Sequence, residues 1–274
     1  MSKKSKTHIE IHGHRGCRGL MPENTLQAFE YAINLGVDVL ELDIAITKDN
    51  EVIISHEPFI SRKICYNPKG KKIPKAMDMQ YNLYNMAFNE IQQFDCGLKL
   101  NKDYPNQKKV KAYKPLLIEL FKLKTTKKSD VRFNIEIKSK PEYYGVFTPQ
   151  PNEYVKLIFD EINKHNMFNS LNLQSFDLNI LEEIKKQSPK TKVALLVDKD
   201  ESIAAKRKAL SYKAEIISPY YKLLDKPTVQ NLKADHFKVI PWTVNTTSAM
   251  QQMISCNVDG IITDFPNRLI ELLD

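Results

Sequence analysis

Several features that mark special classes of protein are missing from this sequence. No window approaches the roughly 20 apolar residues that a membrane-spanning helix needs, and there is neither a low-complexity tract nor a strict internal repeat. The hydrophobic share of 42% and the charged share of 27% are those of an ordinary soluble protein. We therefore expect a soluble chain without stable membrane insertion.

Cysteine is scarce and irregularly spaced. The four cysteines include no Cys-x-x-Cys pair; they are Cys17, Cys65, Cys96 and Cys256. Such spacing is typical neither of a zinc site nor of a small disulfide scaffold. The sequence therefore predicts free thiols in a reducing compartment. The basic segment Met1–Ile9 precedes no apolar stretch, which predicts no signal peptide and a cytoplasmic location, or a periplasmic one if the N-terminus has been trimmed.

Acidic residues are outnumbered by basic ones. The chain has 41 Lys and Arg against 33 Asp and Glu, a formal net charge of +8. Many of the lysines fall in two runs, Arg62–Lys75 and Lys99–Lys114. These runs hold few aromatic residues and no known nucleic-acid-binding motif. A solvated basic insertion is therefore favoured over a nucleic-acid partner, and nothing in the sequence predicts an oligomeric state.

Short β-branched runs alternate with helical stretches along the chain. The predicted strands are Ile9–His14, Val37–Ile46, Val131–Lys138, Leu171–Phe176, Val193–Val197, Glu215–Ser218, Val239–Val244 and Asp259–Thr263. The predicted helices are Asn24–Leu35, Pro115–Leu123, Asn152–His165, Asp177–Gln187, Ser202–Ser211, Thr228–Ala234, Ser248–Ser255 and Asn267–Leu273. Asp177 and Thr246 stand where helix N-caps are expected.

Eight β/α pairs in 274 residues predict a closed (β/α)8 TIM barrel. The alternation breaks once, between residues 57 and 114, which is too long for a bare connection. We expect a single domain over residues 1–274, with 57–114 as a subdomain inserted after strand two. Glu51–Ser55 is expected to be a short extra strand that turns back at Asp49-Asn50.

Acidic residues stand on two of the predicted strands. Side chains alternate along a strand, so Glu41 and Asp43 share the face opposite Leu40 and Leu42. In a barrel the helix-facing side is apolar, so the two carboxylates point inward. On the third strand, Glu136 shares a face with Asn134 and Lys138. Because the two strands are expected to be adjacent, Glu136 should come close to Glu41 and Asp43. Three clustered carboxylates favour a hard divalent cation, Mg²⁺ or Ca²⁺; the alternative is an internal salt-bridge cluster with Lys138 and Arg15.

Two histidines accompany these carboxylates. His14 ends the first strand, where catalytic groups of a barrel gather, and His56 follows the extra strand. Imidazoles titrate near neutral pH and suit acid and base roles, while Arg15 can hold a phosphate through two hydrogen bonds. Trp242, the one tryptophan, either fills the core or lines the cleft. Asp264 is expected to cap the last helix rather than to take part in catalysis.

Taken together, these segments resemble the glycerophosphodiester phosphodiesterase family. The matching stretches, in family order, are His14-Arg-Gly, Pro22-Glu-Asn-Thr-Leu26, Glu41-Leu-Asp43, Ser55-His-Glu57, Asn134-Ile-Glu-Ile-Lys138, Gln174-Ser-Phe176, Trp242-Thr-Val-Asn245 and Asp259-Gly-Ile-Ile-Thr-Asp-Phe-Pro266. The resemblance covers nearly the whole chain and departs at no motif position.

This resemblance implies a TIM barrel that hydrolyses small deacylated phospholipids, such as glycerophosphocholine, to sn-glycerol 3-phosphate and an alcohol. It implies that a divalent metal is held by Glu41, Asp43 and Glu136. It also implies His14 and His56 as acid and base, Arg15 and Lys138 as phosphate contacts, Trp242 in the cleft, and an insertion that overhangs the active site.

Two other functions stay open. Lysophospholipids could be the substrates if the insertion offers an apolar groove, or the same residues could form a buried helix face; they are Met77, Met79, Tyr81, Leu83, Tyr84, Met86 and Phe88. The chain could instead be an inactive barrel that binds phosphodiesters, since a fold alone does not prove catalysis. The intact carboxylates and histidines favour an enzyme.

Overall fold

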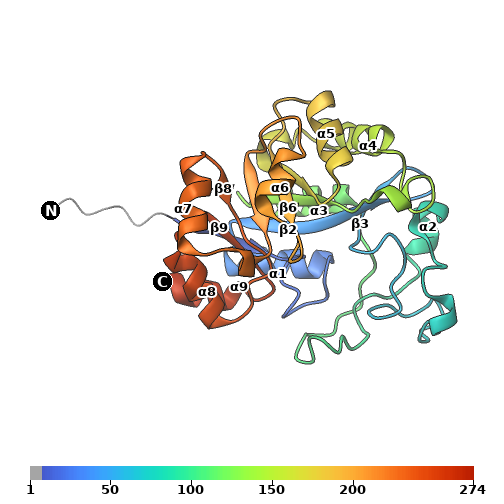
Figure 1. Ribbon diagram of the computed structural model, residues 1–274. Helices are drawn as coiled ribbons and strands as arrows, with labels where there is room; N and C mark the ends of the chain where they lie inside the picture. Colours follow the sequence, from blue (N-terminus) through green and yellow to red (C-terminus); the bar gives the residue numbers. More distant parts are fainter. Residues whose placement is uncertain (1–7) are drawn as a thin grey trace.

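The computed structural model describes residues 8–274 and shows a barrel of parallel strands wrapped by helices (Figure 1). The strands follow the order β1-β2-β4-β5-β6-β7-β8-β9 around the ring. Their bounds are β1 Glu10–Gly13, β2 Val39–Ile46, β4 Arg132–Ile137, β5 Leu171–Ser175, β6 Val193–Val197, β7 Ile216–Pro219, β8 Lys238–Val239 and β9 Gly260–Thr263. The predicted TIM barrel is confirmed.

The ring closes between β8 and β9 through irregular backbone. The strand expected over Val239–Val244 is regular only at its first residue, because Pro241 has no N–H to donate to a ladder. Hydrogen bonds continue on both sides nonetheless. The amide of Trp242 donates to Pro219 O of β7 at 3.0 Å, and the amide of Val244 donates to Ile262 O of β9 at 3.0 Å. The segment therefore closes the barrel although it is not a regular strand.

The helices begin and end close to the predicted positions. Their bounds are α1 Leu26–Leu35, α2 Phe88–Ile91, α3 Leu117–Thr126, α4 Pro151–Lys164, α5 Leu178–Gln187, α6 Ile203–Lys208, α7 Lys226–Ala234, α8 Thr247–Ser255 and α9 Pro266–Leu273. Short 3₁₀ turns are η1 Lys75–Met77, η2 Leu83–Asn85, η3 Pro141–Tyr143, η4 Phe168–Ser170 and η5 Tyr221–Leu223. Asp177 and Thr246 cap α5 and α8 through their side chains, as predicted.

The segment between β3 (Val52–Ile54) and α3 leaves the barrel as long loops with only η1, η2 and α2 (Figure 1). Strand β3 pairs antiparallel with β2, so the predicted backward turn is confirmed. These loops share a small apolar core made of Ala45, Ile53, Ile60, Cys65, Ile73, Leu83, Ile91, Phe94 and Cys96. This segment therefore packs on β2 and β3 through its own core.

The prediction that all four cysteines are free is wrong. Cys65 and Cys96 form a disulfide within the inserted loops, while Cys17 and Cys256 are free and buried. The two partners are 31 residues apart in a segment without periodic structure. Spacing alone could not reveal that the loops bring them together.

Most of the apolar residues proposed as a groove are packed instead. Leu83 belongs to the small core, and Met77, Tyr81, Met86 and Phe88 pack against it. They lie on the turns η1 and η2, on the one-turn helix α2 and on the loops between them, rather than on one long helix face. Only Met79 of the set is largely exposed. Among residues 8–274, no helix is long and apolar enough to cross a membrane.

Candidate active site

A cavity of about 370 Å³ opens at the carboxyl ends of the barrel strands. It is lined by His14, Arg15, Arg18, Glu41, His56, Glu136, Lys138, Gln174, Phe176, Leu196, Asp198, Trp242, Thr243 and Ile262. Another cavity, of about 400 Å³, lies beside α6 and is lined by apolar and basic residues and by Tyr212, with no acidic residue or histidine. The mouth of the barrel is therefore the candidate active site, because it combines acid, base and cationic groups.

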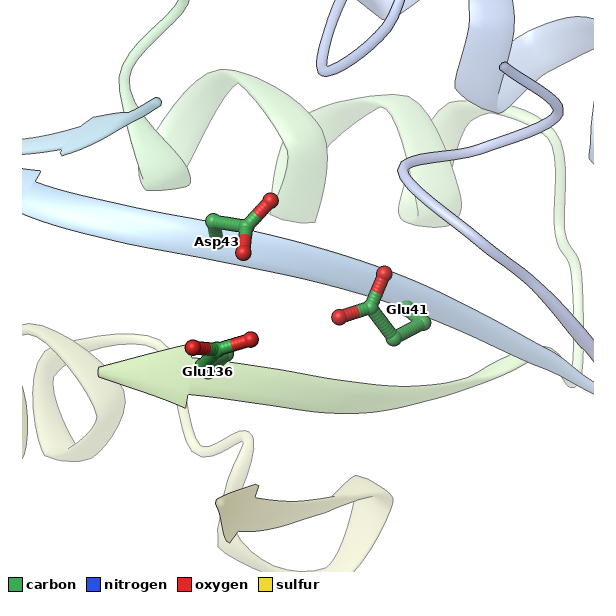
Figure 2. A group of neighbouring side chains, drawn as sticks. All are labelled: Glu41, Asp43 and Glu136. Carbon is green, nitrogen blue, oxygen red and sulfur yellow. The ribbon is translucent and has the colours of Figure 1, made fainter. Parts of the chain in front are cut away.

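Three carboxylates meet at one side of this cavity. Glu41 and Asp43 come from β2 and Glu136 from the neighbouring β4, and their side chains lie close together (Figure 2). One oxygen from each lies within 4.8 Å of the others, and all three residues are buried. The register explains the cluster, since Asp43 is directly paired with Glu136 across the two parallel strands.

Basic side chains neutralise this cluster only in part. Lys138 Nζ lies 2.7 Å from Glu136 Oε1, and Arg15 Nε lies 3.3 Å from Asp43 Oδ2. Burial alone would raise the pKa of Asp43, but the charge of Arg15 holds it well below its ordinary value. Glu41 accepts hydrogen bonds only from neutral groups. These are the backbone N–H of Arg15 at 2.9 Å and the side-chain amide Nε2 of Gln174 at 3.1 Å. Burial, then the charges of Asp43 and Glu136, raise the pKa of Glu41 well above its ordinary value.

The cluster fits a divalent cation. Asp43 Oδ1 is buried and has no hydrogen-bond partner, although its other oxygen accepts from Asn24 at 2.9 Å. Unpaired buried carboxylate oxygens are costly unless a cation meets them. Oxygen-only ligands suit Mg²⁺ or Ca²⁺. The internal salt-bridge alternative therefore accounts for Glu136, leaves Glu41 without a basic partner, and gives Asp43 Oδ1 only Lys138 Nζ at 3.8 Å.

His14 is held in one orientation by an aspartate from the far end of the chain. Its Nδ1 lies 2.5 Å from Asp264 Oδ1, so Nδ1 carries the proton and Nε2 is left facing Glu41 at 3.8 Å. Burial lowers the pKa of His14 to about 4, a shift that Asp264 opposes and Arg18 assists. A neutral imidazole with a free Nε2 can accept a proton at neutral pH.

The predicted capping role of Asp264 is wrong. Helix α9 begins with Phe265 as its N-cap, and no side chain caps it. Asp264 is instead fully buried and accepts hydrogen bonds from Arg18 Nε at 3.0 Å, Tyr104 Oη at 2.7 Å and Asn245 Nδ2 at 2.6 Å. Four donors converge on one carboxylate, which explains why its pKa lies well below the ordinary value despite burial.

His56 follows β3 and is more exposed than His14. Its Nδ1 lies 3.1 Å from Glu57 Oε1, and 29% of its side chain is accessible. Burial alone would raise the pKa of Glu57, but the hydrogen bond and charge of His56 lower it to about 2. Each of the two predicted histidines thus has its own carboxylate, and both line one cavity.

The comparisons with known proteins agree with this geometry. The profile of the glycerophosphoryl diester phosphodiesterase family matches residues 14–268. The chain belongs to this family. A glycerophosphodiester phosphodiesterase from Caldanaerobacter subterraneus subsp. tengcongensis is 32% identical to it over 95% of this chain and 96% of the relative. A rat lysophospholipase D is 24% identical over 99% of this chain and 88% of its own length.

Solved structures of family members have the same fold. A provisionally assigned glycerophosphoryl diester phosphodiesterase from Silicibacter pomeroyi matches with a TM-score of 0.88 and 25% identity, covering 98% of this chain and 95% of that one. An Oleispira antarctica phosphodiesterase, solved with its product sn-glycerol-3-phosphate, matches with a TM-score of 0.76 and 20% identity over 97% and 96% of the two chains.

Several residues of this glycerophosphoryl diester phosphodiesterase site had no role in the sequence-based prediction. Asn24 and Gln174 lie in the matched motifs, and their contacts with Asp43 and Glu41 could have been sought there. Glu23 binds the Arg15 guanidinium at 2.7 Å. Tyr104 comes from the inserted loops, where neither periodicity nor a matched motif points to it.

Proposed function

We propose that this chain is a divalent-metal-dependent phosphodiesterase that hydrolyses glycerophosphodiesters to sn-glycerol 3-phosphate and an alcohol. The observation that carries the proposal is a single cavity that adjoins the cluster of three carboxylates and is lined by two carboxylate-paired histidines and three basic side chains. The family supports it, as does the sn-glycerol-3-phosphate in the Oleispira antarctica relative.

The proposed site consists of a metal-binding carboxylate cluster and two proton-transfer groups. Glu41, Asp43 and Glu136 would hold Mg²⁺ or Ca²⁺, and the cation would polarise the phosphoryl oxygens and neutralise the charge that develops on them. Arg15 and Lys138, which line the same cavity, add electrostatic stabilisation of the phosphoryl group. Both are also paired with carboxylates of the site, which fixes where their positive charge lies.

The two histidines divide the proton transfers between them. His14 is the better base, because burial keeps it neutral and Asp264 holds the proton on Nδ1. Its Nε2 takes the proton of the nucleophile, which is either water or the glycerol 2-hydroxyl through a cyclic phosphate. His56, exposed at the rim beside Glu57, donates a proton to the departing alkoxide. Trp242 lines the cleft for the organic part of the substrate.

Small, water-soluble substrates are favoured over lysophospholipids. The rat relative carries the name lysophospholipase D. In this chain, however, the apolar residues that could have formed an acyl groove mostly pack into the core of the inserted loops. Comparing turnover on glycerophosphocholine and on lysophosphatidylcholine decides between the two substrate classes.

We propose that residues 1–274 form one domain with 57–114 as its insertion. We also propose that the protein functions in a compartment that is oxidising enough for a disulfide to persist. The sequence predicted the cytoplasm, but the Cys65–Cys96 bond favours an oxidising compartment.

The reaction is tested by measuring glycerol 3-phosphate release from glycerophosphocholine with a coupled dehydrogenase. The protein is first stripped with chelator and then supplied with Mg²⁺ or Ca²⁺. We expect release only with metal, and expect Glu41→Gln and His56→Ala to lose at least about 100-fold in kcat. Glu271→Gln, an exposed change on α9, is the matched control. Full activity after exhaustive chelation would contradict the proposed metal requirement. Near-normal turnover of His56→Ala would contradict the proposed roles of the two histidines.

A further inference from the structure

The inserted segment 57–114 carries almost the whole net charge of the molecule. It holds twelve Lys and Arg against five Asp and Glu, a formal net charge of +7, whereas the complete chain has +8. Its stretch Arg62–Lys75 includes six basic side chains and no acidic one. The rest of the chain is therefore nearly neutral, and the positive field of the protein originates where the inserted loops project from one side of the barrel (Figure 1).

Two parts of this segment are held side by side by the Cys65–Cys96 disulfide. Across this junction, Lys99 Nζ donates hydrogen bonds to the backbone carbonyls of Arg62 and Cys65. Burial, followed by the charges of Lys72 and Arg62, lowers the pKa of Lys99. The basic side chains of the two parts are thus close enough to repel one another, and they form one patch of like charge.

A tight turn in this patch presents further lysines to solvent. The backbone N–H groups of Lys69 and Lys71 donate to Asn67 Oδ1 at 3.1 and 2.9 Å, which orders the turn, and both lysines are exposed. Within residues 8–274, Arg62 alone of the patch has a carboxylate in ion-pair range, Asp78 at 3.0 Å. We define the basic patch by these residues: Arg62, Lys63, Lys69, Lys71, Lys72 and Lys99.

Exposed apolar side chains flank the basic patch. Five large apolar side chains are exposed in the part of the chain that the structure describes, and three of them belong to the inserted segment. Leu98 and Leu100 stand on either side of Lys99 and are 43% and 46% exposed. Met79, also exposed, follows the carboxylate that pairs with Arg62. Apolar and cationic groups therefore share one surface, a combination that indicates an interaction site.

We propose that the basic patch and the two leucines dock the protein on an anionic lipid surface. The lysines gain from the negative potential of the head groups, and the leucines enter the apolar boundary just beneath them. A nucleic acid would attract the same lysines but offers no hydrocarbon to Leu98 and Leu100. In addition, no aromatic side chain of residues 57–114 is exposed enough for a base to stack on it. The observations therefore favour a lipid surface.

This inference goes beyond the proposed function and does not depend on it. The inserted segment is fastened beside the active-site cavity, because Gln107 Nε2 donates to the carbonyls of Arg18 and Met21, and Arg18 lines the cavity. Glycerophosphodiesters arise when the acyl esters of phospholipids are hydrolysed, which takes place at lipid surfaces. Docking would hold the active site where such molecules are released.

The experiment measures co-sedimentation of the full-length protein with vesicles of phosphatidylcholine, alone or mixed with phosphatidylglycerol. We expect binding to the anionic vesicles only, and release in 1 M salt, where the Debye length falls to about 3 Å. Lys69→Gln combined with Lys71→Gln should weaken binding about 25-fold, since each lysine at such a surface contributes about fivefold. Leu98→Ser combined with Leu100→Ser should weaken it about tenfold, because the leucines no longer gain from leaving water.

A matched control removes the same charge elsewhere. Lys190 and Lys208 are exposed and precede β6 and β7, at the end of the barrel opposite the cavity, so Lys190→Gln combined with Lys208→Gln should bind vesicles like the wild type. Equal weakening by the two lysine pairs would overturn the inference, because net charge would then be the cause.

Two further results would also overturn it: no binding to anionic vesicles at low salt, or tighter binding to DNA than to those vesicles. The proposed function is tested separately. Every variant keeps the residues of the cavity and should release glycerol 3-phosphate from dissolved glycerophosphocholine at the wild-type rate, whatever the vesicles show.

Discussion

Asp264 connects the last barrel strand to the first through His14, and it shows how one carboxylate can set the state of the proposed catalytic base. The side chain takes no part in capping α9 and is directed instead at His14 Nδ1 at 2.5 Å. That contact decides which imidazole nitrogen carries the proton and therefore which one is free to act. Because Asp264 does not line the cavity, we expect its role to be the positioning of His14.

Replacing Asp264 with Asn tests this role. The amide keeps the volume but can offer its NH₂ to Nδ1 and so favour the wrong tautomer of His14. We expect kcat to fall by about 10²- to 10⁴-fold with little change in KM. Activity is measured by glycerol 3-phosphate release, with circular dichroism to verify folding. A variant that folds and keeps near-normal kcat would show that Asp264 serves the fold alone.

The part of the inserted loops over residues 57–114 takes part in this arrangement, although it holds neither of the two proposed proton-transfer groups. Gln107 Nε2 donates to the carbonyls of Arg18 and Met21 at 2.7 and 2.8 Å, so the loops are fastened to the segment after β1. Tyr104 belongs to the same loops. Its hydroxyl donates to Asp264, and its ring lies 5.0 Å from the guanidinium of Arg18. The loops therefore help to fix Asp264 behind His14.

Tyr104→Phe isolates this contribution, because only the hydroxyl is lost. We expect kcat to fall about three- to tenfold, which corresponds to the loss of one ordinary hydrogen bond of about 1 kcal/mol, with KM unchanged. Tyr113→Phe is the matched control, since Tyr113 lies in the same loops but bonds Glu119. Equal effects of the two changes, or a change confined to KM, would contradict the positioning role.

Sequence pattern predicted the regular elements well and the inserted loops poorly. Helices such as Leu178–Gln187 follow from apolar spacing and a capping residue, Asp177. The pair of inward carboxylates follows from strand alternation at Glu41 and Asp43. The pairing of Cys65 with Cys96 and the reach of Tyr104 depend instead on how irregular loops fold over long sequence distances. Periodicity does not encode such contacts, so only the structure reveals them.

The disulfide predicts a specific thiol count. Protein denatured in guanidinium without reductant should react with two equivalents of a thiol reagent, from Cys17 and Cys256, and with four after reduction. Replacing Cys65 and Cys96 by Ser together should cost about 2–4 kcal/mol of unfolding free energy, because a long loop is no longer closed in the unfolded chain. Four reactive thiols before reduction would restore the free-thiol prediction.

The molecule as a whole is basic, with a formal charge of +8, yet its active site concentrates negative charge at three buried carboxylates. This contrast has a consequence for stability. The folded pKa of Glu41 is raised above its unfolded value, so the folded state holds this proton more tightly. Its stabilising effect is fully present below the unfolded pKa and is lost as the pH rises through the folded pKa. A bound cation offsets the charge that then appears.

Metal should therefore stabilise the protein more at pH 8 than at pH 5. At a metal concentration 100 times its Kd, the gain at pH 8 should approach about 3 kcal/mol, measured as a shift in Tm by calorimetry. Glu41→Gln should melt higher than the wild type when both are metal-free at pH 8, because one buried charge is gone, and should gain less from added metal. Glu271→Gln should behave like the wild type in both respects. If metal-free Glu41→Gln melts lower than the wild type, the carboxylate repulsion inferred for this cluster is wrong, and the salt bridges of Arg15 and Lys138 suffice to neutralise it.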